Sequence, residues 1–221
     1  AKYELAKMYI EIGDPEAARD TLLELMEESD GGILAKAQAL LDEGATVTLV
    51  SGPTNLPFPE GAQVIEVTSA AEMKDAVMTH LQDKDAFISV AAVADFTPSS
   101  TASEKIKKTG QNLTLELVPT VDILRTVSDE RQRSNPGMLV IGFAAETTQT
   151  YENARKKLQE KGLDLIIAND VGQPQPIFGS DQNKVAFIHA DGQIEEFPWM
   201  PKYAVGEKLV NFLIHKWEQN D

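Results

Sequence analysis

The sequence predicts an α/β protein with a doubly wound, mostly parallel sheet and a C-terminal hairpin. Three observations lead to this prediction. Residues 1–43 contain only helical patterns, short β-rich runs alternate with amphipathic helical stretches after residue 46, and most of these runs are apolar along their whole length. Strands of that kind are typical of parallel sheets whose two faces are both covered by helices.

The first elements are expected to be helices. Apolar residues recur at the 3.6-residue period through "AKYELAKMYIEIGDPEAARDTLLELMEESD", and "GDP" at residues 13–15 interrupts them. Asp14 is a suitable cap and Pro15 a suitable first residue for a second, antiparallel helix. A third helix, "ILAKAQALLDEG", ends at its glycine. We therefore divide the chain into a helical hairpin at 1–30 and an α/β domain at 31–221.

Six β-rich runs follow. "LTLELV" alternates polar and apolar residues, so we expect it to pair antiparallel or to lie at an edge. Helical stretches at about 69–82, 120–134 and 148–162 separate several of the runs, a hairpin turns at Asp191-Gly192, and a last helix covers about 202–218. The six runs are TVTLVS (46–51), QVIEVT (63–68), AFISVA (86–91), LTLELV (113–118), LVIGFA (139–144) and DLIIAN (164–169).

Composition narrows the classes of partner. The formal net charge of -15 opposes general attraction to nucleic acids or to anionic membranes. The absence of cysteine excludes disulfides, thiolate zinc sites and cysteine nucleophiles, and it agrees with a reducing compartment. We find no apolar run of about 18 residues and no secretory leader. We expect a soluble, cytoplasmic protein that binds neither nucleic acid nor membrane.

Three loops that follow predicted strands are candidates for a binding site, because ligands of open parallel sheets lie at the carboxyl ends of the strands. They read "VAAVADF", "GFAAET" and "ANDV". Their small residues permit close approach of a ligand to backbone N–H groups. Each loop taken alone is better explained as a tight turn with a capping carboxylate, whereas the three together favour a pocket. Their candidate oxygen ligands are Asp95, Glu146, Asn169 and Asp170.

Lysines supply the positive charge that a phosphate ligand needs. Lys105, Lys107 and Lys108 follow the polar stretch "TPSSTAS", which suits a mobile lid. Lys157 and Lys161 lie four residues apart on one predicted helix face, where the alternative is an ordinary solvated surface. The three histidines share no ligand spacing, and we assign no metal ligand.

Common catalytic signatures are absent from the sequence. It contains no G-x-x-x-x-G-K-[ST], no G-x-G-x-x-G after a strand, no H-E-x-x-H and no G-x-S-x-G. The chain therefore has the fold class of dinucleotide oxidoreductases but lacks their glycine-rich fingerprint.

From about residue 35 the chain resembles the bacterial phosphopantothenoylcysteine synthetases. The matching segments are "GATVTLVSGP", "AAVADF", "EKIKK", "VDIL", "GFAAET" and "LDLIIANDV", which occur in the family's order and with its spacing. The resemblance implies a Rossmann-like fold and a CTP-dependent ligase of coenzyme A biosynthesis. Such a ligase would join 4'-phosphopantothenate to cysteine through an acyl-cytidylate, with Mg²⁺ bound to the phosphates of CTP. A free carboxylate resists attack by an amine, whereas the acyl-cytidylate reacts because CMP is a good leaving group.

The resemblance also implies roles for single residues. Lys105 matches the family's flexible-loop lysine, which contacts the nucleotide and supports catalysis. Ala92 and Asp95 would adjoin the phosphopantothenate. "VDIL" lacks the proline that usually precedes its aspartate, which puts the backbone path there in doubt. The implied nucleotide-binding residues are Ser89, Val90, Ala91, Asp95, Lys105, Val121, Asp122, Ile123, Leu124, Phe143, Lys157, Lys161 and Asn169.

The front of the chain departs from the family. The family's first strand, its glycine-rich phosphate turn and its Asn…Ser-Ser-Gly-Lys-Met-Gly stretch are not found. Residues 1–30 instead resemble the tetratricopeptide-like helices of FimV-type pilus-assembly proteins, which suggests a chimera joined between about 30 and 43. We expect a sheet that lacks one strand and a ligase that is impaired. The alternatives are a catalytically inactive fusion and a protein-interaction module.

Two further points stay open at this stage. The resemblance implies a homodimer, because family dimers complete the site across the subunit boundary. No residue can be assigned unambiguously to recognition of the nucleotide's base, so the choice between CTP and ATP is undecided.

Overall fold

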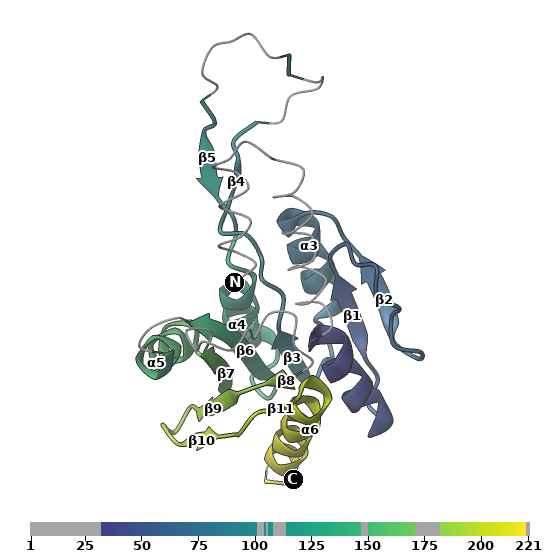
Figure 1. Ribbon diagram of the computed structural model, residues 1–221, viewed down its shortest axis with the longest axis vertical. Coiled ribbons are helices and arrows are strands. Elements are labelled where there is room, and N and C mark those ends of the chain that lie inside the picture. The colour runs from purple at the N-terminus through teal and green to yellow at the C-terminus, as the bar shows by residue number, and fades with distance from the viewer. Residues whose placement is uncertain are drawn as a thin grey trace.

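Five strands form the main sheet of the protein in the computed structural model, which describes residues 32–100, 104, 106–107, 114–146, 150–170 and 182–219. Their order is β10–β9–β7–β6–β3 (Figure 1). β3, β6 and β7 are parallel, whereas β9 and β10 are antiparallel. The predicted, mostly parallel α/β sheet is therefore confirmed. The strands are Ala86–Ser89 (β3), Leu139–Glu146 (β6), Leu165–Asp170 (β7), Val185–His189 (β9) and Ile194–Glu196 (β10).

Helices pack on both faces of this sheet, because successive side chains of a strand point to opposite faces. In β6, the fully buried Val140 belongs to the core layer formed with α4 (Ile123–Ser134) and α5 (Thr150–Lys161). Its neighbour Ile141, also fully buried, belongs to the opposite layer, formed with α6 (Lys202–Glu218). The doubly wound arrangement follows from strands that are apolar on both faces.

A second, smaller parallel sheet contains β1 (Thr48–Ser51) and β2 (Gln63–Glu66). Within the described residues it shares no strand pairing with the five-stranded sheet. The helix α3 (Ala70–His80) leads from it to β3 and begins with a capping box in which Ser69 and Glu72 bond to each other's backbone N–H. The predicted single sheet is thus interrupted between β1 and β3.

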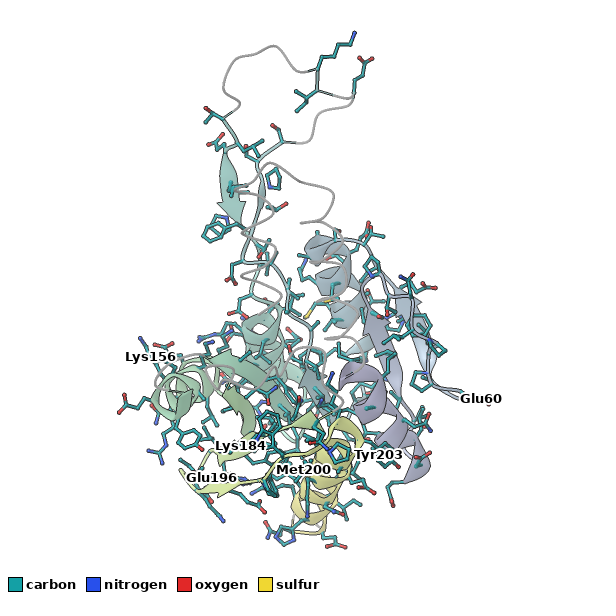
Figure 2. The ribbon with its side chains drawn as sticks, in the orientation of Figure 1. Glu60, Lys156, Lys184, Glu196, Met200 and Tyr203 are labelled. Atoms are coloured by element: carbon teal, nitrogen blue, oxygen red, sulfur yellow. The ribbon has the colours of Figure 1, made fainter. Side chains whose placement is uncertain are left out.

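An arm of two antiparallel strands rises from the body (Figure 1). It consists of β4 (Phe96–Pro98) and β5 (Leu117–Pro119). Figure 2 shows the side chains of this arm away from the other elements, and Phe96 and Leu117 are 58% and 54% exposed. The arm places the loop after β3 and the segment before α4 side by side at its base, since the backbone N–H of Thr120 donates to the carbonyl of Asp95 at 2.9 Å.

The end of the chain packs against a helix over residues 32–42. The Tyr203 hydroxyl, labelled near the start of α6 in Figure 2, donates to the Asp42 carboxylate at 2.7 Å. Just before α6, β11 (Met200–Pro201) pairs antiparallel with β8 (Gln182–Asn183). Among the described helices, none combines the length and the apolar character needed to cross a membrane.

Most predicted elements are found, with shifts at their ends. The hairpin at Asp191-Gly192 is the β9–β10 turn, and α6 has the predicted bounds. "LTLELV" differs, because only its last two residues belong to β5, and its partner β4 falls in a predicted loop. Its antiparallel pairing agrees with its alternating pattern. The predicted helical hairpin at 1–30 lies outside the described residues.

Candidate functional site

The carboxyl ends of three adjacent parallel strands form one edge of the main sheet. Ser89 at the end of β3 is in register with Gly142 of β6, and Asn169 near the end of β7 is in register with Ala145 of β6. Open parallel sheets bind ligands beyond this edge. The structure therefore brings the three segments chosen from the sequence to neighbouring strand ends, but only "VAAVADF" follows its strand as a loop, because "GFAAE" and "AND" are the last residues of β6 and β7.

A cavity of about 420 Å³ reaches the end of β3. Ser89, Val90 and Ala91 line it together with Ile123 from the start of α4. These four predicted nucleotide-binding residues thus share one cavity, which is mainly apolar and continues between β1 and β3. Lys36, from the helix over residues 32–42, is a cation in the same lining.

Lys36 is a residue that the sequence analysis did not select. Its side chain is buried, its Nζ donates to the carbonyl of Gly32 at 2.9 Å, and it lies 4.7 Å from the centre of the Phe143 ring. Burial, and then the charge of Lys202, lower the pKa of Lys36 from 10.5 to about 8. Phe143, predicted to pack on the nucleotide, is half-buried and carries this cation on its ring.

An ion pair occupies the start of α4. Asp122 caps this helix by accepting the backbone N–H of Arg125 at 3.0 Å, and its other oxygen lies 2.9 Å from Lys161 Nζ. Burial disfavours the Asp122 carboxylate, but the hydrogen bonds from Lys161 and Arg125 outweigh it, so the pKa of Asp122 lies below its ordinary 3.8. Two predicted site residues are therefore in direct contact.

Asn169 has a buried amide oxygen without a hydrogen-bond partner among the described residues. Asn183 of β8 has a second such oxygen, and the sequence analysis did not select it. Both lie near the carboxyl end of β7, because Asn169 is in register with Val185, two residues after Asn183. An unpaired buried acceptor costs about 1–3 kcal/mol, so such oxygens are candidates for binding a ligand donor. No sequence signal distinguishes Asn183 from an ordinary turn asparagine.

Other predicted residues are placed less centrally. Ala92 and Asp95 are exposed near the base of the arm, and Val121 is 57% exposed. Leu124 packs under the sheet, where its Cδ2 lies 3.1 Å from the position of a Cβ built on Gly142. Lys157 is exposed on α5. Lys105 and Lys108 lie outside the described residues.

The described residues hold no group of three or more His, Asp or Glu side chains arranged for a metal ion. Mg²⁺ keeps much of its water shell and is commonly bound through substrate phosphates with one or two carboxylates. Magnesium on the phosphates of CTP therefore stays a prediction.

Comparison with protein families gives a matching model. The model of the DNA/pantothenate metabolism flavoprotein C-terminal domain matches residues 16–216. Its match begins within the segment that the sequence analysis assigned to a helical hairpin.

Curated relatives agree with this match. The chain is 43% identical over 177 residues to the coenzyme A biosynthesis bifunctional protein CoaBC of Bacillus subtilis, which covers 80% of this chain and 43% of that protein. It is 39% identical over 190 residues to the protein of the same name from Escherichia coli K12, covering 85% and 46%. The chain therefore spans less than half the length of these two relatives.

Solved structures share the fold. The crystal structure of the C-terminal domain of the coenzyme A biosynthesis bifunctional protein CoaBC is 36% identical, with a TM-score of 0.69 over 85% of this chain and 82% of that one. The DNA/pantothenate metabolism flavoprotein from Streptococcus pneumoniae, at 24% identity, has a TM-score of 0.68 over 82% and 86%. The second likeness concerns the fold alone.

Proposed function

Because the chain belongs to the family of DNA/pantothenate metabolism flavoprotein C-terminal domains, we propose that it serves coenzyme A biosynthesis by joining 4'-phosphopantothenate to cysteine at the expense of CTP. The relatives named for coenzyme A biosynthesis support this role. The proposed substrates are MgCTP, 4'-phosphopantothenate and cysteine.

The proposed reaction has two steps. A carboxylate oxygen of 4'-phosphopantothenate attacks the α-phosphorus of CTP, the bond to the β-phosphate oxygen breaks, and pyrophosphate leaves. The cysteine amine then attacks the acyl carbon, CMP leaves with the bonding electrons, and the amine loses a proton. Lys105 is proposed to neutralise charge on the phosphates during the first step, when charge builds up on the leaving group.

One observation supports the assignment of a nucleotide site: the buried Asn169 amide oxygen at the carboxyl end of β7, which has no hydrogen-bond partner among the described residues. A ribose hydroxyl is a donor of the right kind for it, and binding would satisfy an oxygen that is otherwise costly to bury. Ala145 of the neighbouring strand β6 is the register partner of Asn169. Phe143, two residues before Ala145 in β6, supplies an aromatic surface.

We also propose that this 221-residue chain by itself turns over slowly. Among the strands that the structure describes, the sheet is interrupted between β1 and β3, beside Ser89 at the end of β3, so backbone groups there have no described neighbouring strand on that side. Loss of one donor that stabilises a developing charge typically costs about 10²–10³ in rate. Nucleotide affinity depends less on such contacts and is expected to persist.

Calorimetric titration with MgCTP tests the nucleotide site. Saturable binding is expected, and Lys105→Ala should weaken it by about 10- to 100-fold, as expected for a charge-assisted hydrogen bond. Asn169→Ala should weaken it by about 2- to 10-fold. Lys156→Ala is the matched control, because Lys156 is 72% exposed and its removal changes the net charge equally. Equal losses in all three variants would contradict a specific site.

A second assay tests the chemistry. Pyrophosphate release from CTP should require 4'-phosphopantothenate, and CMP release should require cysteine in addition. We expect rates at least about 10²-fold below the 10 s⁻¹ that is typical of enzymes. Ordinary rates would contradict the proposed impairment, while absence of both MgCTP binding and turnover would contradict the ligase assignment.

A further inference from the structure

Lys36 is a charged residue in an unusual position. Its residue surface is only 4% exposed, although lysine is rarely buried without a partner of opposite charge. Among the described residues, its Nζ contacts the Gly32 carbonyl at 2.9 Å and the Phe143 ring at 4.7 Å, and neither group is an anion. An ammonium group has three N–H donors, and this carbonyl accepts one of them. These contacts therefore offset the cost of burying the charge only in part.

A second lysine, Lys202 at the start of α6, comes close to the same place. A Cβ built on Gly32 lies 3.5 Å from Lys36 Nζ and 3.9 Å from Lys202 Cδ. The charge of Lys202 adds to burial in lowering the pKa of Lys36. Two like charges near each other disfavour their charged forms. The pair is thus a local concentration of positive charge that an anion would stabilise.

Helix packing holds the two lysines together in spite of this repulsion. Gly206 of α6 allows a close approach of the helix over residues 32–42, because a Cβ on Gly206 would lie 3.0 Å from Ala39 Cβ and 3.2 Å from Lys36 Cα. The hydrogen bond from Tyr203 to Asp42 also joins these two helices. Folding, and not ligand binding, therefore brings the charges together. Such preorganisation favours binding of an anion.

Lys36 lies at the ligand-binding edge of the main sheet. Its ring contact, Phe143, is one residue past the register partner of Ser89, the last residue of β3. Lys36 also lines the 420 Å³ cavity that reaches this strand end. The other charged residues of the described lining, Lys84 and Asp85, precede β3 at its opposite end. The cavity is therefore positive where ligands of parallel sheets bind, and its apolar surroundings strengthen attraction to an anion.

We propose that Lys36 and Lys202 form a binding site for a phosphate group at the carboxyl end of β3, on the face of the sheet where Phe143 packs with the α6 core layer. A phosphate dianion balances two ammonium groups and accepts hydrogen bonds from both. Free phosphate, pyrophosphate, CTP and 4'-phosphopantothenate all carry the required group. The proposal does not rest on the ligase assignment. Because the chain has a net charge of -15, binding depends on these short-range contacts and not on general attraction.

The pKa of Lys36 reports occupancy of the site, because an anion beside an amine favours its charged form. The test follows the Lys36 Cε resonance of the full chain by NMR as the pH is raised, with and without excess sodium pyrophosphate. We expect the ligand to raise the pKa from about 8 by at least about one unit. Lys208 is the internal control, because its Nζ also lies over a ring, 5.7 Å from the centre of Phe197, but the residue is exposed.

Variants measure the contribution of each lysine. Lys36→Met and Lys202→Met keep an unbranched side chain of similar bulk. Each should weaken pyrophosphate binding in a calorimetric titration by at least about tenfold, as expected for loss of a charge-assisted hydrogen bond. Lys208→Met changes the net charge equally and should change the affinity by less than about twofold.

The same titrations with inorganic phosphate, MgCTP and 4'-phosphopantothenate identify the source of the phosphate group. A loss of affinity in Lys36→Met for one of the two substrates assigns the phosphate of that substrate to the site. A loss confined to inorganic phosphate and pyrophosphate assigns a site for free ions, separate from the nucleotide site. Both results support the proposal.

Three results would overturn it. A Lys36 pKa that none of the four ligands changes would show that no anion binds beside the amine. Equal losses of affinity in Lys36→Met and Lys208→Met would show general charge attraction. A Lys36 pKa near 10.5 before any ligand is added would show that the chain itself balances the charge. The NMR titration of the parent chain decides the matter even where a variant does not fold. Since titrations with inorganic ions involve neither CTP nor turnover, their failure is distinguishable from failure of the ligase assignment.

Discussion

Lys161 Nζ lies 2.9 Å from the Asp122 carboxylate, which also accepts the backbone N–H of Arg125 at 3.0 Å. One carboxylate therefore caps α4 and holds the last residue of α5 against it. Lys161 was predicted to bind phosphate together with Lys157, and this role stays a prediction, while in the structure its ammonium group is paired with Asp122. An incoming nucleotide would have to compete with Asp122 for this ammonium group.

Substitutions at Asp122 separate its two roles. Asp122→Ala should lower the free energy of unfolding by about 1 kcal/mol through loss of the cap. Asp122→Ser keeps a capping oxygen but loses the ion pair, so it should cost well under about 1 kcal/mol, because the pair is partly exposed. Urea unfolding measures both values. Equal losses for the two variants would contradict a capping role.

The same residue predicts a pH dependence. The pKa of Asp122 is lowered in the folded protein, so its contribution to stability is present above the ordinary value of 3.8 and is lost as the pH falls through the lower, folded pKa. The stability gap between the parent chain and Asp122→Ser should therefore close in acid, below about pH 4. A gap that stays constant from pH 6 to pH 3 would contradict the lowered pKa.

Lys36 predicts that the stability of the protein depends on pH at alkaline pH, because burial lowers the pKa of its amine. Its folded pKa of about 8 lies below 10.5, so between these values the unfolded chain binds more protons and stability rises with pH. Relative to Lys36→Met, the parent chain should gain on the order of 1–3 kcal/mol across this window, since one pKa unit is about 1.4 kcal/mol. Lys202→Met, which removes a repelling charge, should reduce the rise. Parallel pH profiles for the parent and Lys36→Met would contradict the burial of a titrating amine.

Gly142 predicts a steric effect beneath the site. A Cβ at this position would lie 2.9 Å from Leu163 Cδ1 and 3.1 Å from Leu124 Cδ2. Gly142→Ala should therefore destabilise by about 1–3 kcal/mol, as overpacked core variants do. Gly52→Ala is the control, because nothing lies within 4 Å of its added Cβ. Combining Gly142→Ala with Leu124→Ala should cost less than the sum of the two, and strict additivity would contradict the clash.

Asp164 predicts the largest loss of stability. Asp164 is paired with Arg131 and accepts the backbone N–H of Val140 at 2.7 Å. The Asp164 side chain is 30% exposed, and the Arg131 side chain is 14% exposed. Asp164→Ala should destabilise by about 3 kcal/mol or more, because it strands a partly buried charge and an N–H donor. Arg133→Ala removes a pair that is 74% exposed on the arginine side and should cost under about 0.5 kcal/mol. Similar losses for both variants would contradict this ranking.

The sequence predicted where several candidate residues lie in the fold, while their part in binding a nucleotide stays a prediction. Ser89, Val90, Ala91 and Ile123 line one cavity, and Asn169 lies at a strand end. These positions follow from strand runs that end in small or polar residues, which is local information. Lys36 and Asn183 were missed, because their burial depends on elements far away in the sequence. The role of Lys105 stays a prediction.

By itself, the sequence determined most of the longer strands and helices, the β9–β10 turn and the bounds of α6, because side-chain periodicity and turn residues act over a few positions. The short strands β4, β8 and β11 were not predicted. Tertiary structure alone decided which strands pair: β4 with β5, and β1 with β2 apart from β3. Pairing depends on backbone hydrogen bonds between distant segments, and the β-rich runs at β1 and β3 carry the same apolar pattern whether or not a neighbour lies beside them.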